Sequence, residues 1–487
     1  MRGDIFPFLC HYNGVGANTF AQIYIIRPRP LEPTMSHDPS PHDVRSAFKR
    51  ELISANLWRT RIVVVGTASI AGLVVVAFTW LAESAFAQFN KIAEFAWWVP
   101  LIWTPLLCAA IVWVTRRFVR GAGGSGIPQV MAALDPAISG GRRPLLVSLK
   151  ISFAKIGLTS AGLLGGLSLG REGPSVQIAA GVMLAARRWL PRGSGISAHS
   201  LLVAGGAAGI AAAFNTPLAG IMFAIEELSR APEQRNSGLI VAAIVLAGLI
   251  AVSVHGNGPH FGVIHPGPIG LSLLWPGLLA AVVCGFAGGL FARVLIASLR
   301  GVSPDLPTRW RARYPVRFAL GCGFLIAVIG VLSGGATYGS GNEATRSLLE
   351  NEANVPAAFA LFKFVATWLT AWSGVPAGIF APSLSIGAAM GQNIASITGY
   401  PYSAALIALG MVGFLAAATQ APLTAFIIVM EMVDGHSMVL SLMACAVVAS
   451  TVSRVLTPPL YSALATIQLP PRPVHPASPG EPPERAP

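Results

Sequence analysis

Long runs of apolar residues without a charged side chain constrain this chain more than any other feature. An α-helix needs roughly 20 such residues to cross the hydrocarbon core of a bilayer. Charged residues make up only 11% of the chain, against about 25% in an average soluble domain. Ten-residue segments of alternating hydrophobicity, typical of a membrane β-barrel, are absent. We therefore predict an all-α polytopic membrane protein. The clearest apolar runs are Ile62–Trp80, Ser237–Val254, Leu271–Ala292 and Met438–Val452.

The formal net charge is +13, and the basic residues gather in short connections between apolar runs. Lys and Arg in such connections orient a membrane protein with its basic loops in the cytoplasm. A nucleic-acid-binding protein would carry its basic patch on a folded soluble domain, and the chain has no sequence for one. We expect no nucleic acid as partner. The basic clusters are Arg45–Arg61, Arg116/Arg117/Arg120, Arg142/Arg143, Arg187/Arg188/Arg192 and Arg300–Arg317.

The five cysteines are scattered, and four of them lie in apolar runs. This pattern is typical of small core residues and not of a disulfide or metal framework, so we expect no metal site. They are Cys10, Cys108, Cys284, Cys322 and Cys445.

Both ends of the chain differ from its apolar body. Residues 1–58 are polar and proline-rich, lack the order of regions found in a signal peptide, and are expected to be largely disordered and cytoplasmic. The composition shift after Met35 makes that residue an alternative start. Residues 466–487 form a proline-rich tail that we also expect to be disordered and cytoplasmic.

The apolar body repeats itself, with a first transmembrane repeat expected over 59–265 and a second over 266–465. The segment Gly170–Gly181 matches Gly378–Ala389, and Gly205–Leu228 matches Gly410–Val433. Four features recur in the same order, which indicates a duplication. The matched single residues are Lys155 with Lys363, Pro174 with Pro382, Pro217/Leu218 with Pro422/Leu423, and Glu226 with Glu431.

Three glycine-rich turns, each followed by a proline, predict helices that begin inside the membrane. They are "GSGIP" (Gly124–Pro128), "GREGP" (Gly170–Pro174) and "GIFAP" (Gly378–Pro382). Glycine lets the backbone approach closely, and proline is tolerated in the first helical turn. Helix N-termini carry free N–H groups and a partial positive charge. Transporters built from two repeats place such broken helices at a substrate site near the midplane, so converging starts would form a cage for a small anion.

At these residues the chain resembles the CLC family of chloride channels and proton-coupled chloride transporters. The resemblance continues through "AAAFNTPLAGIMFAIEEL" and "APLTAFIIVMEM" to "PPLYSAL" (Pro458–Leu464), and spans roughly residues 60 to 465. It implies two inverted-topology repeats of broken, tilted helices. It also implies a homodimer with one complete pore in each subunit, in the inner membrane of a bacterium. Chloride and protons would be the transported ions, with no cofactor.

The resemblance further implies roles for single residues. Glu172 would be the gate, a carboxylate that competes with chloride for the anion site and swings away when protonated. The alternative is a structural pair between Glu172 and Arg171, but ionisable residues inside a membrane are by default functional. Arg171 would add positive potential at the outer mouth. Gly124, Gly126, Pro128, Gly173 and Pro174 would support the site.

Four further residues would hold the central chloride. The hydroxyls of Ser125 and Tyr461 would donate hydrogen bonds to the ion, and the backbone N–H groups of Ile379 and Phe380 would complete the site. Neutral donors hold an ion weakly enough for it to leave again. For Tyr461 the alternative is an anchor at the membrane interface.

Acidic residues separate exchangers from channels in this family. In proton-coupled members, the second of two adjacent acids collects protons from the cytoplasm. This chain keeps both acids, Glu226 and Glu227, so Glu227 would have this role. The alternative for Glu227 is a solvated carboxylate at a helix end. We expect Glu226 and its repeat mate Glu431 to be structural, bound to helix N-termini or basic side chains.

The chain departs from the family pattern after "GSGIP". Gln129 stands where an acid is usual, and Met131 follows shortly after. No counter-charge for Lys155 is therefore evident. Snorkelling of Lys155 and a contribution to the anion potential are both open.

Several other classes fit the chain less well. Ser168 lies in "GLSLG", the G-x-S-x-G pattern of a hydrolase, but no strand precedes it and no buried histidine and acid accompany it. "GAGGSG" (Gly121–Gly126) lacks the βαβ unit of a dinucleotide site. We therefore expect a chloride–proton antiporter and not an enzyme. A passive chloride channel is the nearest alternative, and a non-transporting membrane scaffold or intramembrane hydrolase a remote one.

Overall fold

The computed structural model describes residues 55–136, 138, 141–229, 237–256, 258–267, 270–301, 305–350 and 355–469. Helix α2 begins at Ala55, so it includes the last four residues of the expected N-terminal region. The remainder of that region, with Met35 and Cys10, and the tail from residue 470 lie outside the described residues. The predicted boundary between the repeats falls in the connection between α10 and α11.

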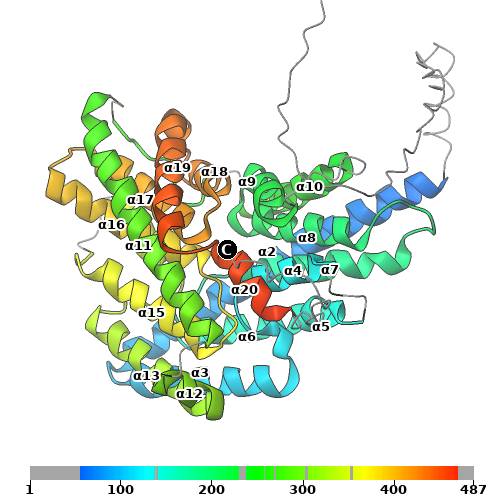
Figure 1. Ribbon diagram of the computed structural model, residues 1–487, viewed down its shortest axis with the longest axis horizontal. Helices are drawn as coiled ribbons and strands as arrows, with labels where there is room; N and C mark the ends of the chain where they lie inside the picture. The colour runs from blue at the N-terminus through cyan, green and yellow to red at the C-terminus, as the bar shows by residue number, and fades with distance from the viewer. Residues whose placement is uncertain are drawn as a thin grey trace, which may run out of the picture. The chain divides into compact units, whose positions relative to one another are not determined.

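The described residues form an all-α protein, as predicted (Figure 1). The first half holds α2 (Ala55–Phe95), α3 (Val99–Phe118), α4 (Ile127–Leu134), α5 (Arg143–Leu146), α6 (Leu149–Leu164), α7 (Glu172–Ala185), α8 (Ala198–Phe214), α9 (Pro217–Phe223) and α10 (Ser237–His255). The second half holds α11 (Leu274–Arg300), α12 (Leu306–Arg313), α13 (Pro315–Leu332), α14 (Asn342–Leu349), α15 (Phe359–Ser373), α16 (Phe380–Thr398), α17 (Ser403–Thr419), α18 (Pro422–Met432), α19 (Val439–Leu456) and α20 (Leu460–Gln468). Short 3-10 turns and one π-helical segment (Ala224–Ser229) complete the described elements.

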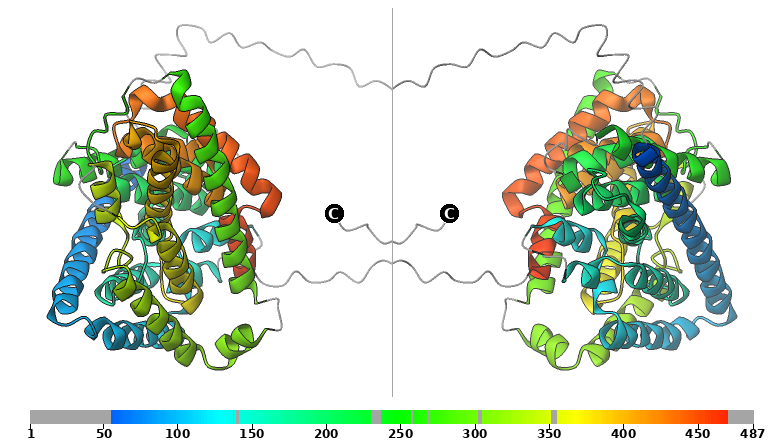
Figure 2. Two further views of the ribbon diagram at one scale, coloured as in Figure 1. Left: turned by 90° about the vertical axis from the view of Figure 1, so that its left-hand side faces the viewer. Right: turned by 90° about the vertical axis from the view of Figure 1, so that its right-hand side faces the viewer.

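Six helical segments among the described residues are long and apolar enough to cross a membrane. They contain or overlap three of the four runs predicted from the sequence, and the fourth lies in the 19-residue helix α10. The longest, α2, has 41 residues and runs along one edge of the molecule in both views of Figure 2. The chain is therefore an integral multi-pass membrane protein. The six are Ala55–Phe95, Val99–Phe118, Arg143–Leu164, Leu271–Arg300, Pro315–Leu332 and His436–Leu456.

Helix breaks fall at equivalent places in the two halves. Asn215 follows the last residue of α8 and Gln420 follows the last residue of α17, and both residues have φ of 60°. This left-handed conformation stops a helix, and few residues other than glycine and asparagine adopt it. Pro217 and Pro422 then start the next helices, because proline suits a first helical turn. The chain around each of these two breaks thus forms a pair of helices, α8 with α9 and α17 with α18.

Contacts between the halves follow a two-fold pattern. The equivalent helices α7 and α16 touch, as do α9 and α18, and α3 and α13. Gly170 N–H donates to the Gly378 carbonyl at 2.8 Å, and Gly378 N–H donates back to the Gly170 carbonyl at 3.1 Å. Reciprocal contacts between equivalent residues are the signature of a two-fold relation. They are the contacts expected of the predicted inverted repeats.

The centre of the molecule is built from helices that are buried on nearly every side. Almost all residues of α8 and α17 are buried. Helix α8 packs on α7 in the first half, and α17 packs on α16 in the second half. A helix that is apolar all round belongs in a core. This core holds the starts of α7 and α16 in fixed positions. The four described cysteines are free and buried, as predicted.

Candidate anion site

The three predicted helix starts meet at one place. The Gly124 carbonyl accepts a hydrogen bond from Ala377 N–H at 3.2 Å, which joins the turn before α4 to the turn before α16. The Gly170–Gly378 pair joins the turns before α7 and α16. These bonds bring "GSGIP", "GREGP" and "GIFAP" together, as the sequence predicts. The N-terminal ends of three helices therefore converge inside the protein.

Close approach of the backbones makes glycine necessary at Gly126. Its φ is 114°, and a Cβ there would collide with the carbonyl oxygen of Gly173. Gly173 in turn lies against Ser125, so that a Cβ on Gly173 would meet the Ser125 hydroxyl. Any larger residue would push α4 away from α7. Pro128 and Pro174 lie in the first turns of these helices and are buried.

The carboxylate of Glu172 points toward the start of α16. Glu172 is the first residue of α7 and is 2% exposed. Its Oε2 accepts a hydrogen bond from Ala381 N–H at 3.4 Å, within the first turn of α16. A free N–H group at a helix start favours a negative partner. The carboxylate thus occupies the kind of position that an anion would take.

Arg171 has a different partner from the one considered in the sequence. Its guanidinium makes a salt bridge with Glu83 of α2, and not with the neighbouring Glu172. Arg171 and Glu83 line a cavity of about 780 Å³, which we call the Arg171 cavity. Nothing in the sequence pattern singled out Glu83, because it lies 88 residues before its partner.

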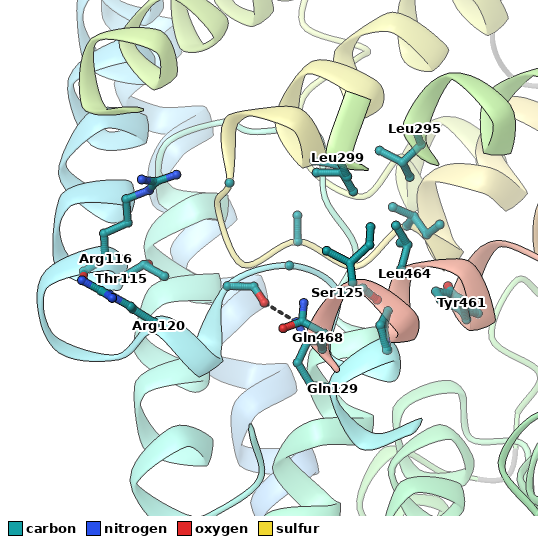
Figure 3. Close-up of a pocket in the computed structure, with 18 of the residues that line it drawn as sticks. Thr115, Arg116, Arg120, Ser125, Gln129, Leu295, Leu299, Tyr461, Leu464 and Gln468 are labelled. Carbon is teal, nitrogen blue, oxygen red and sulfur yellow. Dashed lines mark hydrogen bonds between the residues drawn. The ribbon is translucent and has the colours of Figure 1, made fainter. Parts of the chain in front are cut away.

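Ser125 and Tyr461 line a second cavity of about 510 Å³, which we call the Ser125 cavity (Figure 3). Both hydroxyls are buried, and neither has a hydrogen-bond partner in the described part of the chain. Buried hydroxyls are almost always paired. Two orphaned donors on one cavity wall therefore point to a ligand that accepts hydrogen bonds.

The start of α16 borders the same cavity. Ile379 lines it, and the Phe380 ring stacks on the Tyr461 ring with centroids 5.8 Å apart. Tyr461 is completely buried, which excludes an anchor at the membrane interface. The first N–H groups of a helix have no partner within it. Ile379 and Phe380 thus bring backbone donors to the neighbourhood of the two hydroxyls.

Glu227 lines a third cavity and does not line the Ser125 cavity. It is 7% exposed and belongs to the π-helical segment that follows α9. The cavity measures about 280 Å³ and is also lined by Asp135, His199 and Thr466. The burial of Glu227 does not fit the alternative of a solvated carboxylate at a helix end. We call this space the Glu227 cavity.

Gln129 closes the turn before α4. Its Oε1 accepts a hydrogen bond from Gly126 N–H at 2.8 Å, and its Nε2 donates to the Gly123 carbonyl. A carboxylate can accept the first bond but, when ionised, cannot donate the second. The departure from the family pattern thus supplies two of the hydrogen bonds that hold this turn.

Lys155 is completely buried, so it does not snorkel. Its Nζ donates to the carbonyls of Ala122 at 2.8 Å and Gly124 at 2.6 Å. Lys363, its repeat mate, donates in the same way to Thr337 at 2.9 Å and Gly339 at 2.8 Å. Backbone carbonyls, and not an acid, satisfy both ammonium groups.

The Lys363 contacts reveal a repeat of the first glycine turn that our sequence analysis missed. Gly339–Gly341 reads "GSG", as Gly124–Gly126 does, and each precedes a short helix, α14 or α4. The first glycines have φ of 65° and 74°, and the second have 86° and 114°. The matched lysines Lys155 and Lys363, each downstream of its own "GSG" turn, were the signal that could have revealed this repeat. Ser340 lines the Arg171 cavity, whereas Ser125 lines the cavity named after it.

The hydrolase pattern around Ser168 has a structural explanation. Ser168 is completely buried, and its hydroxyl forms a hydrogen bond with the Thr367 hydroxyl at 2.8 Å. Among the described residues, its hydrogen-bond partner is therefore neither a histidine nor an acid. The pattern arises from the glycines that surround the start of α7.

Comparison with known proteins agrees with this geometry. The family model "Voltage gated chloride channel" matches residues 107–454. A protein of Citrobacter koseri, the H(+)/Cl(-) exchange transporter ClcA, is 31% identical over 427 residues, which cover 82% of this chain and 86% of that protein. The solved structure of a slow cyanobacterial Cl-/H+ antiporter is similar with a TM-score of 0.71 at 24% identity, covering 84% of this chain and 98% of that one. A CLC-type fluoride/proton antiporter is similar with a TM-score of 0.69 at 20% identity, covering 83% and 96%. The chain, with its duplicated broken helices and converging helix starts, therefore belongs to the CLC family of voltage gated chloride channels and related transporters.

Proposed function

We propose that this protein exchanges chloride for protons across a membrane, with Glu172 as the gate. The observation that carries the proposal is the hydrogen bond between Glu172 Oε2 and Ala381 N–H at the meeting point of the helix starts. An ionised carboxylate there excludes an anion from the same donors. Protonation removes the charge, so the side chain leaves and chloride takes its place.

The positions of the cavities support a chloride route. Arg171 borders one cavity, and Gly173 packs against Ser125 on the wall of another, so Glu172 lies between the two. Chloride would pass from the Ser125 cavity, held by Ser125, Tyr461 and the N–H groups of Ile379 and Phe380. Neutral donors bind an ion without trapping it.

A separate cavity supports a separate proton route. Glu227 lines the Glu227 cavity and does not line the Ser125 cavity. A proton would enter at Glu227 and reach Glu172, while chloride takes the other path. The names of curated relatives, H(+)/Cl(-) exchange transporters, support exchange over passive conduction.

Orientation follows from the arginines. The Ser125 cavity is lined by Arg116, Arg120 and Arg311, which belong to the basic connections. Because such connections face the cytoplasm, we assign this cavity to the cytoplasmic side and the Arg171 cavity to the outer side. We also infer a homodimer with cytoplasmic termini in a bacterial inner membrane, as in the relatives' family.

Proton and chloride movement in liposomes containing the purified protein tests the proposal. A chloride gradient should drive protons in the opposite direction through the wild type. Glu172→Ala should abolish proton movement and keep chloride flux, and Glu227→Ala should also lose proton movement. Chloride flux without any proton movement in the wild type would instead indicate a channel. No flux of either ion would indicate a scaffold.

A further inference from the structure

The cytoplasmic part of the Ser125 cavity holds a cluster of three arginines, Arg116, Arg120 and Arg311, which we call the arginine cluster. Arg116 lies in the last turn of α3, Arg120 begins the following 3-10 turn, and Arg311 comes from α12. Among the described residues, no acidic one lines this cavity. Figure 3 shows Arg116 and Arg120 on one side of it, and Ser125 and Tyr461 on the other.

Two arginines next to the cluster lie over aromatic rings, whereas Arg120 Nε donates a hydrogen bond to the Arg116 carbonyl at 3.1 Å. Arg117 lies over the Phe118 ring at 5.9 Å, and Arg313 over the Tyr314 ring at 5.4 Å. Within the described residues, no salt bridge includes a member of the cluster. The Arg311 Nε is buried without a hydrogen-bond partner in this part of the chain, and its Nη1 donates to the Ser298 carbonyl at 3.4 Å.

Like charges that share one cavity repel each other, and an anion bound between them would offset that repulsion. Arg116 and Arg120 are exposed and Arg311 is half-buried. Burial lowers the pKa of Arg311, and the Arg116 charge lowers it further. A positive-inside bias explains arginines in loops, but it does not explain why three line one cavity.

Size and chemistry indicate the kind of anion. The cavity volume of about 510 Å³ lies within the range of about 300–1,000 Å³ typical of small-molecule sites. Guanidinium groups bind phosphate oxygens with two parallel hydrogen bonds, which suits them to phosphate better than to a single halide ion. We propose that the arginine cluster binds a phosphate-bearing, multivalent anion that closes the cytoplasmic access of chloride to Ser125.

Binding is tested apart from transport. The regulatory part rests on the proposed chloride route, whereas the binding does not, so calorimetry on the purified full-length chain comes first. Inorganic tripolyphosphate is the probe, with sulfate at matched ionic strength for comparison. We expect saturable binding of tripolyphosphate that weakens at least tenfold in Arg116→Gln and in Arg311→Gln.

Matched controls remove the same charge from the same helices. Arg117→Gln and Arg309→Gln lie outside the cavity lining and should bind the probe within about twofold of the wild type, since exposed single charges contribute little. Arg311→Lys separates attraction by charge from recognition of phosphate, because lysine lacks the two-pronged donor set. We expect it to weaken tripolyphosphate binding several-fold while sulfate remains a poor ligand.

Two further measurements complete the test: inhibition of chloride flux by the probe, and displacement of the probe by a phosphate-bearing lipid. Tripolyphosphate should inhibit chloride flux in liposomes, and inhibition should weaken in Arg116→Gln in step with binding. In nanodiscs, displacement of the probe by phosphatidic acid would assign the site to a lipid headgroup, and no displacement would assign it to a soluble phosphate. The proposal is overturned if the wild type shows no saturable binding, or if Arg116→Gln binds as tightly as Arg117→Gln.

Discussion

Glu226, which follows α9, binds the N-terminus of α18, and Glu431, which lies in α18, binds the N-terminus of α9. The Glu226 carboxylate accepts hydrogen bonds from Leu423 N–H at 3.1 Å and Thr424 N–H at 2.7 Å, at the start of α18. The Glu431 carboxylate accepts from Leu218 N–H at 3.3 Å and Ala219 N–H at 2.8 Å, at the start of α9. This confirms the structural role expected from the sequence. The exchange of caps locks the two repeats together.

Loss of either cap should destabilise the protein by a similar amount. We expect Glu226→Ala and Glu431→Ala each to lower the free energy of unfolding by about 1 kcal/mol, as for other helix caps. Thermal unfolding in detergent measures this as a lower midpoint. Glu350→Ala, which breaks the exposed pair with Arg346, is the control and should change little. If only one cap variant were destabilised, the two contacts would not be equivalent.

The hydroxyls of Ser125 and Tyr461 should matter for anion binding and not for folding. Ser125→Ala and Tyr461→Phe remove groups that have no partner in the described residues, so the unfolding midpoint in chloride-free buffer should stay the same or rise. Each lost hydrogen bond of about 1 kcal/mol should weaken chloride binding about fivefold. Calorimetric titration with chloride measures the affinity. Unchanged affinity in both variants would remove the hydroxyls from the site.

The two buried lysines offer a comparison within one chain. Lys155→Met leaves the carbonyls of Ala122 and Gly124 without their donor, so the turn that carries Ser125 loosens. Lys363→Met has the same effect on the turn at Gly339, on the wall of the other cavity. Because an unsatisfied buried group costs about 1–3 kcal/mol, both should lower the unfolding midpoint. Chloride affinity should fall about tenfold in Lys155→Met and much less in Lys363→Met, and equal losses would contradict this assignment.

Gln129 should contribute through both of its hydrogen bonds. Gln129→Leu removes both, and Gln129→Glu keeps an acceptor for Gly126 N–H but places an oxygen against the Gly123 carbonyl. We expect both variants to bind chloride about tenfold more weakly, the effect of about 1.4 kcal/mol. Chloride titration of the two variants checks this. Wild-type affinity in Gln129→Leu would show that the turn holds without the amide.

Much of the fold was predictable because repetition and composition are local signals. Apolar runs indicated the all-α membrane class, and the matched prolines Pro217 and Pro422 lie at the helix breaks that follow Asn215 and Gln420. The convergence of helix starts followed from glycine turns before prolines. These features depend on what each residue type permits in the backbone, so they can be found without coordinates.

Contacts between distant residues were not predictable in the same way. The sequence left Lys155 without an evident counter-charge, because its partners are backbone carbonyls, which no residue type reveals. Glu83 was missed because its partner Arg171 lies on another helix. The second "GSG" turn was missed because Asn342 and Glu343 follow it where Ile127 and Pro128 follow the first, and proline was the signal used.

The position of a bound halide tests the central claim most directly. Bromide scatters anomalously, so a crystal of the wild type grown in bromide locates the ion without ambiguity. The account predicts a bromide peak within hydrogen-bond distance of Ser125 Oγ and Tyr461 Oη, beside the start of α16, and loss of that peak in a Ser125→Ala, Tyr461→Phe double variant. Ordered bromide found only elsewhere in the protein, with this position empty, would contradict it.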